Sequence, residues 1–140
     1  MGPVLDSSFV SKLYLPEPDS AAAMVLFVSF PETPPSSAVL TDVEVASAIL
    51  RKSTGPNASV LYAAYRSNRD SGAYQVVDAD AQTYVLARQL VERYARLFSL
   101  RSLDAVQLAT ALQIGASEFV ALDRDLIKAA EAEGLTVPRI

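Results

Sequence analysis

Short apolar runs alternate with longer stretches of helical spacing along the chain. The short runs predict buried strands at residues 4–5, 38–40, 74–77 and 118–122, with a last edge strand at 135–137. Apolar residues at helical spacing predict helices over residues 9–14, 21–30, 41–52, 60–72, 80–98, 103–114 and 124–132. Alternating strands and helices are typical of a parallel sheet built through right-handed crossovers. The sequence therefore predicts an α/β fold: one domain over residues 1–140, with a central parallel sheet of about five short strands and helices on both faces.

Some of the predicted helix ends carry local signals. Thr41 and Glu44 have the spacing of a capping box at the start of the helix over residues 41–52. Gly115 and Gly134 follow predicted helices at the position where a left-handed residue commonly ends a helix. The run at residues 21–30 is apolar on all sides, so it forms either part of the core or a surface for a partner.

The composition excludes several kinds of chemistry. The chain has no Cys and no His, which rules out disulfide frameworks, zinc ribbons, His-dependent triads and thiol catalysis. Acid, base or metal chemistry must therefore come mainly from the 16 Asp and Glu residues. The longest apolar run, at residues 21–30, is half the roughly 20 residues that span a bilayer, and no basic region precedes it. We expect a cytoplasmic protein without a membrane anchor.

The charge is uneven along the chain. The net charge is −4, but residues 46–103 carry 8 basic and 4 acidic side chains, which leaves 4 basic and 12 acidic side chains in the flanks. A basic middle beside acidic flanks is either a solvated surface without a role or a substrate contact next to an anionic site. Composition alone leaves these two interpretations open.

Acidic residues follow three of the predicted strands. Asp6, Glu44 and Asp123 come directly or shortly after strands, and Asp104 lies in the first turn of the helix over residues 103–114. Taken singly, each is explained by helix capping or by the helix dipole. Because ligands bind at the carboxyl ends of parallel strands, however, at least three of these carboxylates should share one edge of the sheet. Clustered carboxylates in a crevice need a counter-cation to remain ionised.

The residue types at this edge suggest which cation and which reaction. Oxygen ligands without His or Cys select Mg²⁺ or Mn²⁺, which favour sites shared with phosphate oxygens. The implied reaction is metal-assisted hydrolysis of a phosphodiester. Ser7 and Ser8 could assist it or could simply cap a helix, and Arg101 could contact a phosphate or pair with a carboxylate.

Four sequence blocks resemble the PIN domain family, and within it the VapC-like toxins of toxin–antitoxin pairs. The similarity covers nearly the whole chain and lies in residues 5–17 (LDSSFVSKLYLPE), 40–45 (LTDVEV), 100–112 (LRSLDAVQLATAL) and 122–126 (LDRDL). The blocks occur in the order that the family shows. A single block would be a weak signal, but the third block at this distance from the first, and ahead of the fourth, is specific.

The resemblance implies a hydrolase: an endoribonuclease that depends on Mg²⁺ or Mn²⁺ and in which a metal-bound water attacks the RNA phosphodiester. It implies that Asp6, Glu44, Asp104 and Asp123 hold the metal, with Ser7 or Ser8 assisting. It also implies a homodimer and a VapB-like antitoxin as the protein partner. Contact with RNA is then left to the basic middle of the chain, at Arg51, Lys52, Arg66, Arg69 and Arg101.

Two other functions are compatible with the pattern. A catalytically silent PIN-like module would use the same fold for binding or regulation, although all four acids are present. A doubly wound phosphatase or phosphoacceptor domain would use Asp6 as its nucleophile. The second Asp usual in that class is Ser8 here, and no Lys follows a late strand to steady an acyl phosphate.

Overall fold

The centre of the molecule is a parallel sheet of four short strands. The computed structural model describes residues 2–31 and 33–140, with β1 at Val4–Leu5, β2 at Ser36–Ala38, β3 at Gln75–Val77 and β4 at Phe119–Val120. The strand order is β3-β2-β1-β4, and all three pairings are parallel. The predicted parallel sheet is confirmed. The edge strand expected at residues 135–137 is reduced to one parallel bridge between Glu118 and Thr136.

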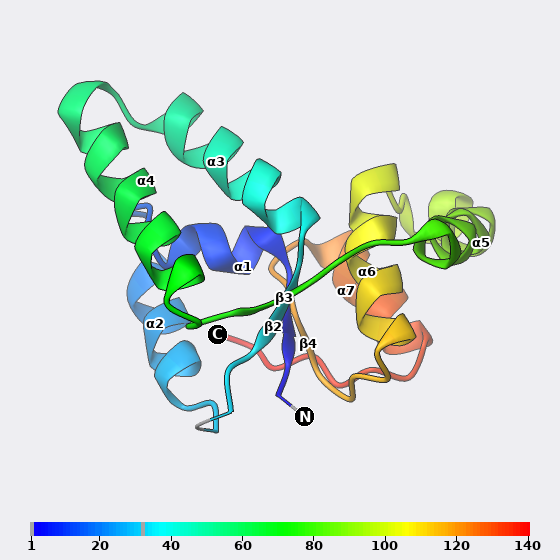
Figure 1. Cartoon of the computed structure of the whole chain (residues 1–140). Coiled ribbons are helices and arrows are strands. Elements are labelled where there is room, and N and C mark those ends of the chain that lie inside the picture. Colours follow the sequence, from blue (N-terminus) through cyan, green and yellow to red (C-terminus); the bar gives the residue numbers. More distant parts are fainter. Residues whose placement is uncertain (1, 32) are drawn as a thin grey trace.

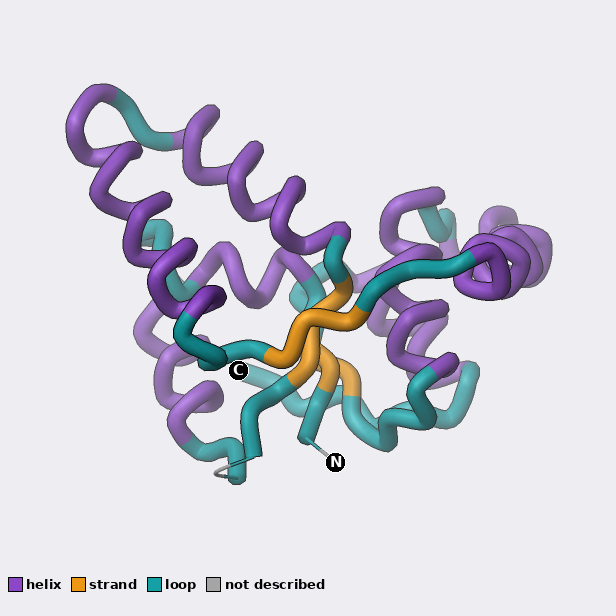
Figure 2. The backbone as a smooth tube through the Cα atoms, viewed as in Figure 1, coloured by secondary structure: helices purple, strands orange, loops and turns teal. Residues whose placement is uncertain are grey.

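The described part of the chain forms seven helices, which cover the two faces of this sheet. Figure 1 shows α1 to α4 on one side of the strands and α5 to α7 on the other, and Figure 2 shows the short strands enclosed between them. The helices are α1 Ser7–Lys12, α2 Ser20–Val28, α3 Leu40–Lys52, α4 Gly55–Asp70, α5 Ala81–Phe98, α6 Ser102–Gln113 and α7 Arg124–Ala132. None of the helices in the described part of the chain is long and apolar enough to cross a membrane.

The core is divided by the sheet into two hydrophobic clusters. Alternate residues of a strand point to opposite faces, so Val4 packs with α5 to α7 and Leu5 packs with α1 to α4. The cluster beneath α5 to α7 is mainly aliphatic and alanine-rich. The other contains the aromatic residues Phe9, Tyr65 and Tyr74. Gly115 and Gly134 have φ of 72° and 91°, which confirms them as left-handed residues after α6 and α7.

Two sequence predictions around β2 and α3 are wrong. The strand was expected at residues 38–40 but lies at Ser36–Ala38. Serine has a low strand propensity, but the backbone of this segment pairs with both β1 and β3, and this pairing makes it a strand. Helical backbone then begins before Thr41, with Val39 as the capping residue and no side-chain cap. Thr41 and Glu44 therefore do not form the predicted capping box. Their side chains face α6, as described below.

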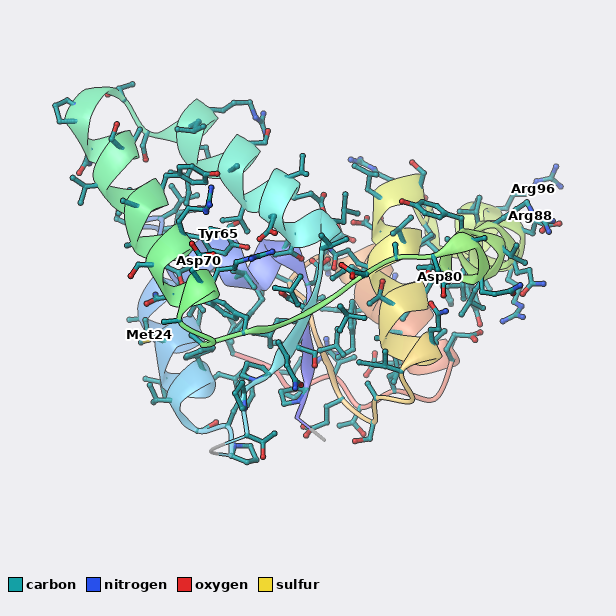
Figure 3. All side chains as sticks on the ribbon, in the orientation of Figure 1. Met24, Tyr65, Asp70, Asp80, Arg88 and Arg96 are labelled. Atoms are coloured by element: carbon teal, nitrogen blue, oxygen red, sulfur yellow. The ribbon has the colours of Figure 1, made fainter. Side chains whose placement is uncertain are left out.

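The apolar run at residues 21–30, most of which forms α2, is partly buried and partly exposed. Ala23 is buried, while Phe27 and Phe30 pack against the aromatic cluster. Val25 and Val28 are 68% and 71% exposed. Met24 is also exposed and lies at the outer edge of the molecule in Figure 3. One side of the run is core, and the other is an exposed apolar surface.

Candidate functional site

Four acidic residues from four helix starts line one cavity of about 500 Å³ at the carboxyl ends of the strands. Asp6 links β1 to α1, and Asp123 caps α7 just after β4. Glu44 lies near the start of α3, and Asp104 lies in the first turn of α6. Figure 1 shows these helix starts at the same end of the sheet. The structure thus brings together all four carboxylates that the sequence singled out.

Asp6 is the most buried of the four, with 2% of its surface exposed. One oxygen, Oδ2, accepts hydrogen bonds from the Ser8 backbone N–H at 3.0 Å and from Ser8 Oγ at 2.5 Å. The other oxygen, Oδ1, is buried and has no hydrogen-bond partner among the described residues. Burial, with smaller contributions from the charges of Asp104 and Glu44, raises the pKa of Asp6 to about 7 in spite of the Ser8 bonds.

Ser8 also links Asp6 to the neighbouring strand end. Its Oγ accepts a hydrogen bond at 3.1 Å from the backbone N–H of Leu122, which follows β4. Ser8 is not the cap of α1, because Asp6 takes that role and accepts from the Ser8 backbone N–H; the Ser8 hydroxyl instead lines the cavity, and its assistance to the chemistry stays a prediction. Ser7 also lines the cavity, and its Oγ donates to Glu44 Oε1 at 3.0 Å.

Asp104 and Asp123 form the α6–α7 side of the cavity. Burial raises the pKa of Asp104 to about 6, with further increases from the charges of Asp123 and Glu44 and a decrease from Arg101. Asp123 is exposed, and its Oδ1 accepts a hydrogen bond from the Leu126 backbone N–H at 2.9 Å. The capping role proposed for Asp123 is thus present, while its position keeps the carboxylate at the cavity.

Cationic side chains also line the cavity. Arg101 lines the cavity before α6, and Arg51 and Lys52 line it from the end of α3, as the sequence suggested for the basic middle. Arg66 and Arg69 lie instead on α4, where Arg69 Nη2 is 3.0 Å from Asp42 Oδ2 and Arg66 Nη2 is 3.9 Å from Asp70 Oδ2. Figure 3 shows Asp70 on α4. Neither arginine lines the cavity, and contact of these two with RNA stays a prediction.

Two polar features of the cavity were missed by sequence reasoning. Lys12 lines the cavity, and its Nζ lies 2.7 Å from Glu17 Oε2 and 2.8 Å from Asp19 Oδ1. The buried Gln107 donates through Nε2 to Glu44 Oε1 at 2.9 Å. Lys12 stands six residues after Asp6, a spacing that does not place two residues on one helix face, so no spacing rule pointed to it. Gln107 stands three residues after Asp104 inside an apolar helix, and only its polarity there was a signal.

The chemistry of the four acids fits a hard divalent cation. All four offer carboxylate oxygens, and Asp6 Oδ1 is buried and free of partners in the described part of the chain. Burial raises the pKa of Asp6 and of Asp104, so both acids are costly to ionise, and a bound cation would offset this cost. Across residues 2–31 and 33–140, no three His, Cys, Asp or Glu side chains stand close enough together to hold one ion as they lie.

Comparison with models of known protein families assigns the chain to a family. Residues 4–132 match the family model of the PIN domain. The chain belongs to the PIN domain family. The matched residues include all four acids of the cavity. A comparison with curated protein sequences found no significant match.

Solved structures share this PIN fold at low sequence identity. A toxin from Mycobacterium tuberculosis, VapC20, described as cleaving the sarcin–ricin loop, has 19% identity and a TM-score of 0.76, with 95% of each chain covered. FitAcB from Neisseria gonorrhoeae has 17% identity and a TM-score of 0.71, covering 96% of this chain and 94% of the other. A toxin–antitoxin complex from Klebsiella pneumoniae has 15% identity and a TM-score of 0.66, covering 96% and 95%. At these identities the similarity establishes the fold.

Proposed function

We propose that this PIN domain is a metal-dependent endoribonuclease and the toxin of a VapBC-type toxin–antitoxin pair. The observation that carries the proposal is the set of four carboxylates, Asp6, Glu44, Asp104 and Asp123, on the walls of one cavity. Burial and the neighbouring acids raise the cost of ionising Asp6 and Asp104, and a cation in the cavity would offset this cost. The fold shared with toxins, one of which is described as cleaving RNA, supports the same reaction.

The acids would hold Mg²⁺ or Mn²⁺, and the neighbouring polar groups would orient the acids. The bound ion supplies a Lewis acid and a source of nucleophilic water at neutral pH. Ser8 fixes Asp6 through Oδ2 and leaves Oδ1 available, while Ser7 fixes Glu44 through Oε1. Arg101 is placed to contact a phosphate oxygen beside Asp104.

A polymeric substrate is supported by the shape and the charge around the acids. A second hollow of about 260 Å³ adjoins the cavity, and the two share Glu17 and Lys52 in their walls. Arg51 and Lys52 line the cavity from the end of α3, and Arg101 lines it from the start of α6. Cations at two places in the cavity wall suit a phosphodiester chain that passes over the acids, because each can contact a different phosphate. RNA is the substrate that we propose.

The proposed partners are a VapB-like antitoxin and a second copy of the chain, in the cytoplasm. Support comes from the fold shared with a toxin of a toxin–antitoxin complex and from the exposed apolar residues of α2, Met24, Val25 and Val28. An exposed apolar patch of this kind is commonly covered by a protein partner.

A catalytically silent PIN-like module is the second candidate. One observation favours it: within the described residues, no three acidic side chains already stand close enough to hold one ion. Such a module would keep the acids as helix caps and bind its partner without cleaving RNA. Metal binding by the purified chain separates the two candidates.

The test is cleavage of total RNA by the purified chain, free of any co-purified partner, with Mg²⁺ or Mn²⁺ and with EDTA. Asp6→Asn and Asp104→Asn are the control variants, because each keeps the side-chain size and removes a charge. Metal-dependent cleavage that both variants lose would support the nuclease and the site together. Cleavage that survives in both variants would show contamination or a different site. A folded chain that cleaves nothing and binds no Mn²⁺ would favour the silent module.

A further inference from the structure

A glutamine from α6 lies behind the acidic cavity and contacts one of its acids. Gln107 is fully buried, and its Nε2 donates to Glu44 Oε1 at 2.9 Å and to Thr41 Oγ1 at 3.0 Å. Thr41, also buried, lies one turn before Glu44 on α3. The side-chain amide of Gln107 on α6 therefore donates hydrogen bonds to two residues of α3.

The hydrogen bonds of Glu44 fix one oxygen and leave the other for a ligand. The bonds from Gln107 Nε2 and Ser7 Oγ both end on Oε1, at 2.9 and 3.0 Å. Two donors that converge on one oxygen from different helices restrict the rotation of the carboxylate. This arrangement orients Oε2 without occupying it.

The residue type suits this task. The two N–H donors of a glutamine amide can serve Glu44 and Thr41 together, and the neutral amide adds no charge beside four carboxylates. A lysine would pair with the acids and compete with a cation, whereas a leucine would leave Glu44 and Thr41 without their buried donor. The carboxylate also decides which way the amide faces, since only its nitrogen can donate to Glu44.

We propose that Gln107 is a positioning residue that holds Glu44 in the orientation needed to bind the divalent cation. This inference rests on the proposed nuclease function. Residues that hydrogen-bond to metal ligands typically change metal affinity about 10-fold to 100-fold when mutated, although they never touch the ion. Gln107 occupies this position relative to Glu44.

The alternative role for Gln107 is purely structural. Its bond to Thr41 joins α3 to α6, so loss of the amide would also loosen the contact between these helices. A structural role predicts a loss of stability that any variant breaking the α3–α6 contact would share. A positioning role predicts a loss of metal affinity larger than the loss of stability explains.

The experiment measures Mn²⁺ affinity by titration calorimetry and thermal unfolding by circular dichroism, on the metal-free chain and three variants. Gln107→Leu removes its bonds to both Glu44 and Thr41, whereas Thr41→Val breaks only the bond to Thr41 and leaves Gln107 bonded to Glu44. Thr110→Val is the matched control, because Thr110 is buried on the same helix and donates only to Val106 O. All three should lose some thermal stability, since each removes a buried hydrogen bond.

Gln107→Leu should weaken Mn²⁺ binding by about 10-fold or more, whereas Thr110→Val should bind as the wild type does and Thr41→Val should lose less than Gln107→Leu. Gln107→Leu with wild-type affinity would overturn the positioning role, as would equal losses in Thr41→Val and Gln107→Leu. A wild-type chain that binds no Mn²⁺ would instead contradict the proposed nuclease. The two failures are therefore distinct.

Discussion

Among the helices of this PIN domain that begin at an aspartate cap, α1 has its cap inside the acidic cavity and α5 has its cap outside it. At the start of α1, Asp6 is buried and receives two hydrogen bonds, both from Ser8 and both on Oδ2. At the start of α5, Asp80 is exposed and its Oδ1 receives bonds from Thr83 N at 3.0 Å and Gln113 Nε2 at 3.0 Å. Figure 3 shows Asp80 beside α6, away from the α1 to α4 side.

Asp6 and Asp80 both cap a helix, but folding shifts their pKa values in opposite directions. Burial and neighbouring acids raise the pKa of Asp6 to about 7, whereas the bonds from Gln113 and Thr83 lower the pKa of Asp80. A cap that is hydrogen-bonded and solvated stabilises its helix as an anion. A cap that is buried among other carboxylates costs stability as an anion, and shifts of this kind are commonly found at functional sites.

The difference between the two caps is tested most directly by replacing each aspartate with asparagine in turn. Asp6→Asn should lower the rate of Mn²⁺-dependent RNA cleavage by at least about 100-fold, because it removes a proposed ligand rather than a residue behind one. Asp80→Asn should leave the rate unchanged, since Asn also caps helices and Asp80 lies outside the cavity. The measurement is the initial rate on one RNA substrate at saturating Mn²⁺.

The folded state of each variant is checked by circular dichroism, so that a lost rate is not a lost fold. If both variants cleaved equally well, Asp6 would be a cap like Asp80, and the distinction between the two helix starts would have no functional meaning.

The second prediction concerns the stability of the chain in EDTA as the pH changes. Because the pKa of Asp6 rises from 3.8 to about 7 on folding, the unfolded chain releases this proton first, and the free energy of unfolding falls as the pH rises between these values. This group alone contributes a fall of about 1.4 kcal/mol per pH unit. Asp104, whose pKa rises to about 6, adds a fall of the same sign. Urea unfolding at pH 5 and pH 8 measures the effect.

Asp6→Asn should flatten this dependence and should make the chain in EDTA more stable than the wild type at pH 8. Added Mn²⁺ should stabilise the wild type at pH 8 and have little effect on Asp6→Asn, because the variant lacks one proposed ligand. Wild-type stability that stays level from pH 5 to pH 8 in EDTA would contradict the buried, uncompensated state of Asp6.

The sequence predicted the acidic cavity because it depends on a rule of topology. Residues that directly follow parallel strands meet at one edge, so the positions of Asp6 and Asp123 could be read from the ends of two apolar runs. The same reasoning failed at β2, because Ser36 and Ser37 carry no strand signal and form a strand only through pairing with both neighbours. Pairing partners on other strands are invisible to local propensity.

The supporting residues of the cavity could not be predicted for a related reason. Gln107 contacts Thr41 and Glu44 across more than 60 residues of sequence, and no period along the chain encodes such a pair. The capping box expected for Thr41 and Glu44 has the right spacing but the wrong partners. Sequence spacing therefore locates the acids and leaves open what holds them, which depends on the packing of α3 against α6.

The last prediction concerns the stabilising cap. Asp80→Ala should lower the melting temperature by a few degrees, because it removes the acceptor of the capping box and leaves the buried Thr83 short of a partner. Asp78→Ala, at an exposed residue two positions earlier, is the matched control and should not shift the melting temperature.

The contribution of Asp80 to stability should also depend on pH. Since folding lowers the pKa of Asp80, its contribution to the free energy of unfolding is present above the ordinary value of 3.8 and is lost as the pH falls through the lowered pKa, opposite in sign to that of Asp6. The difference between wild type and Asp80→Ala should therefore shrink in acid. A difference that grows in acid would mean that Asp80, like Asp6, resists ionisation, and the contrast between the two helix starts would then be lost.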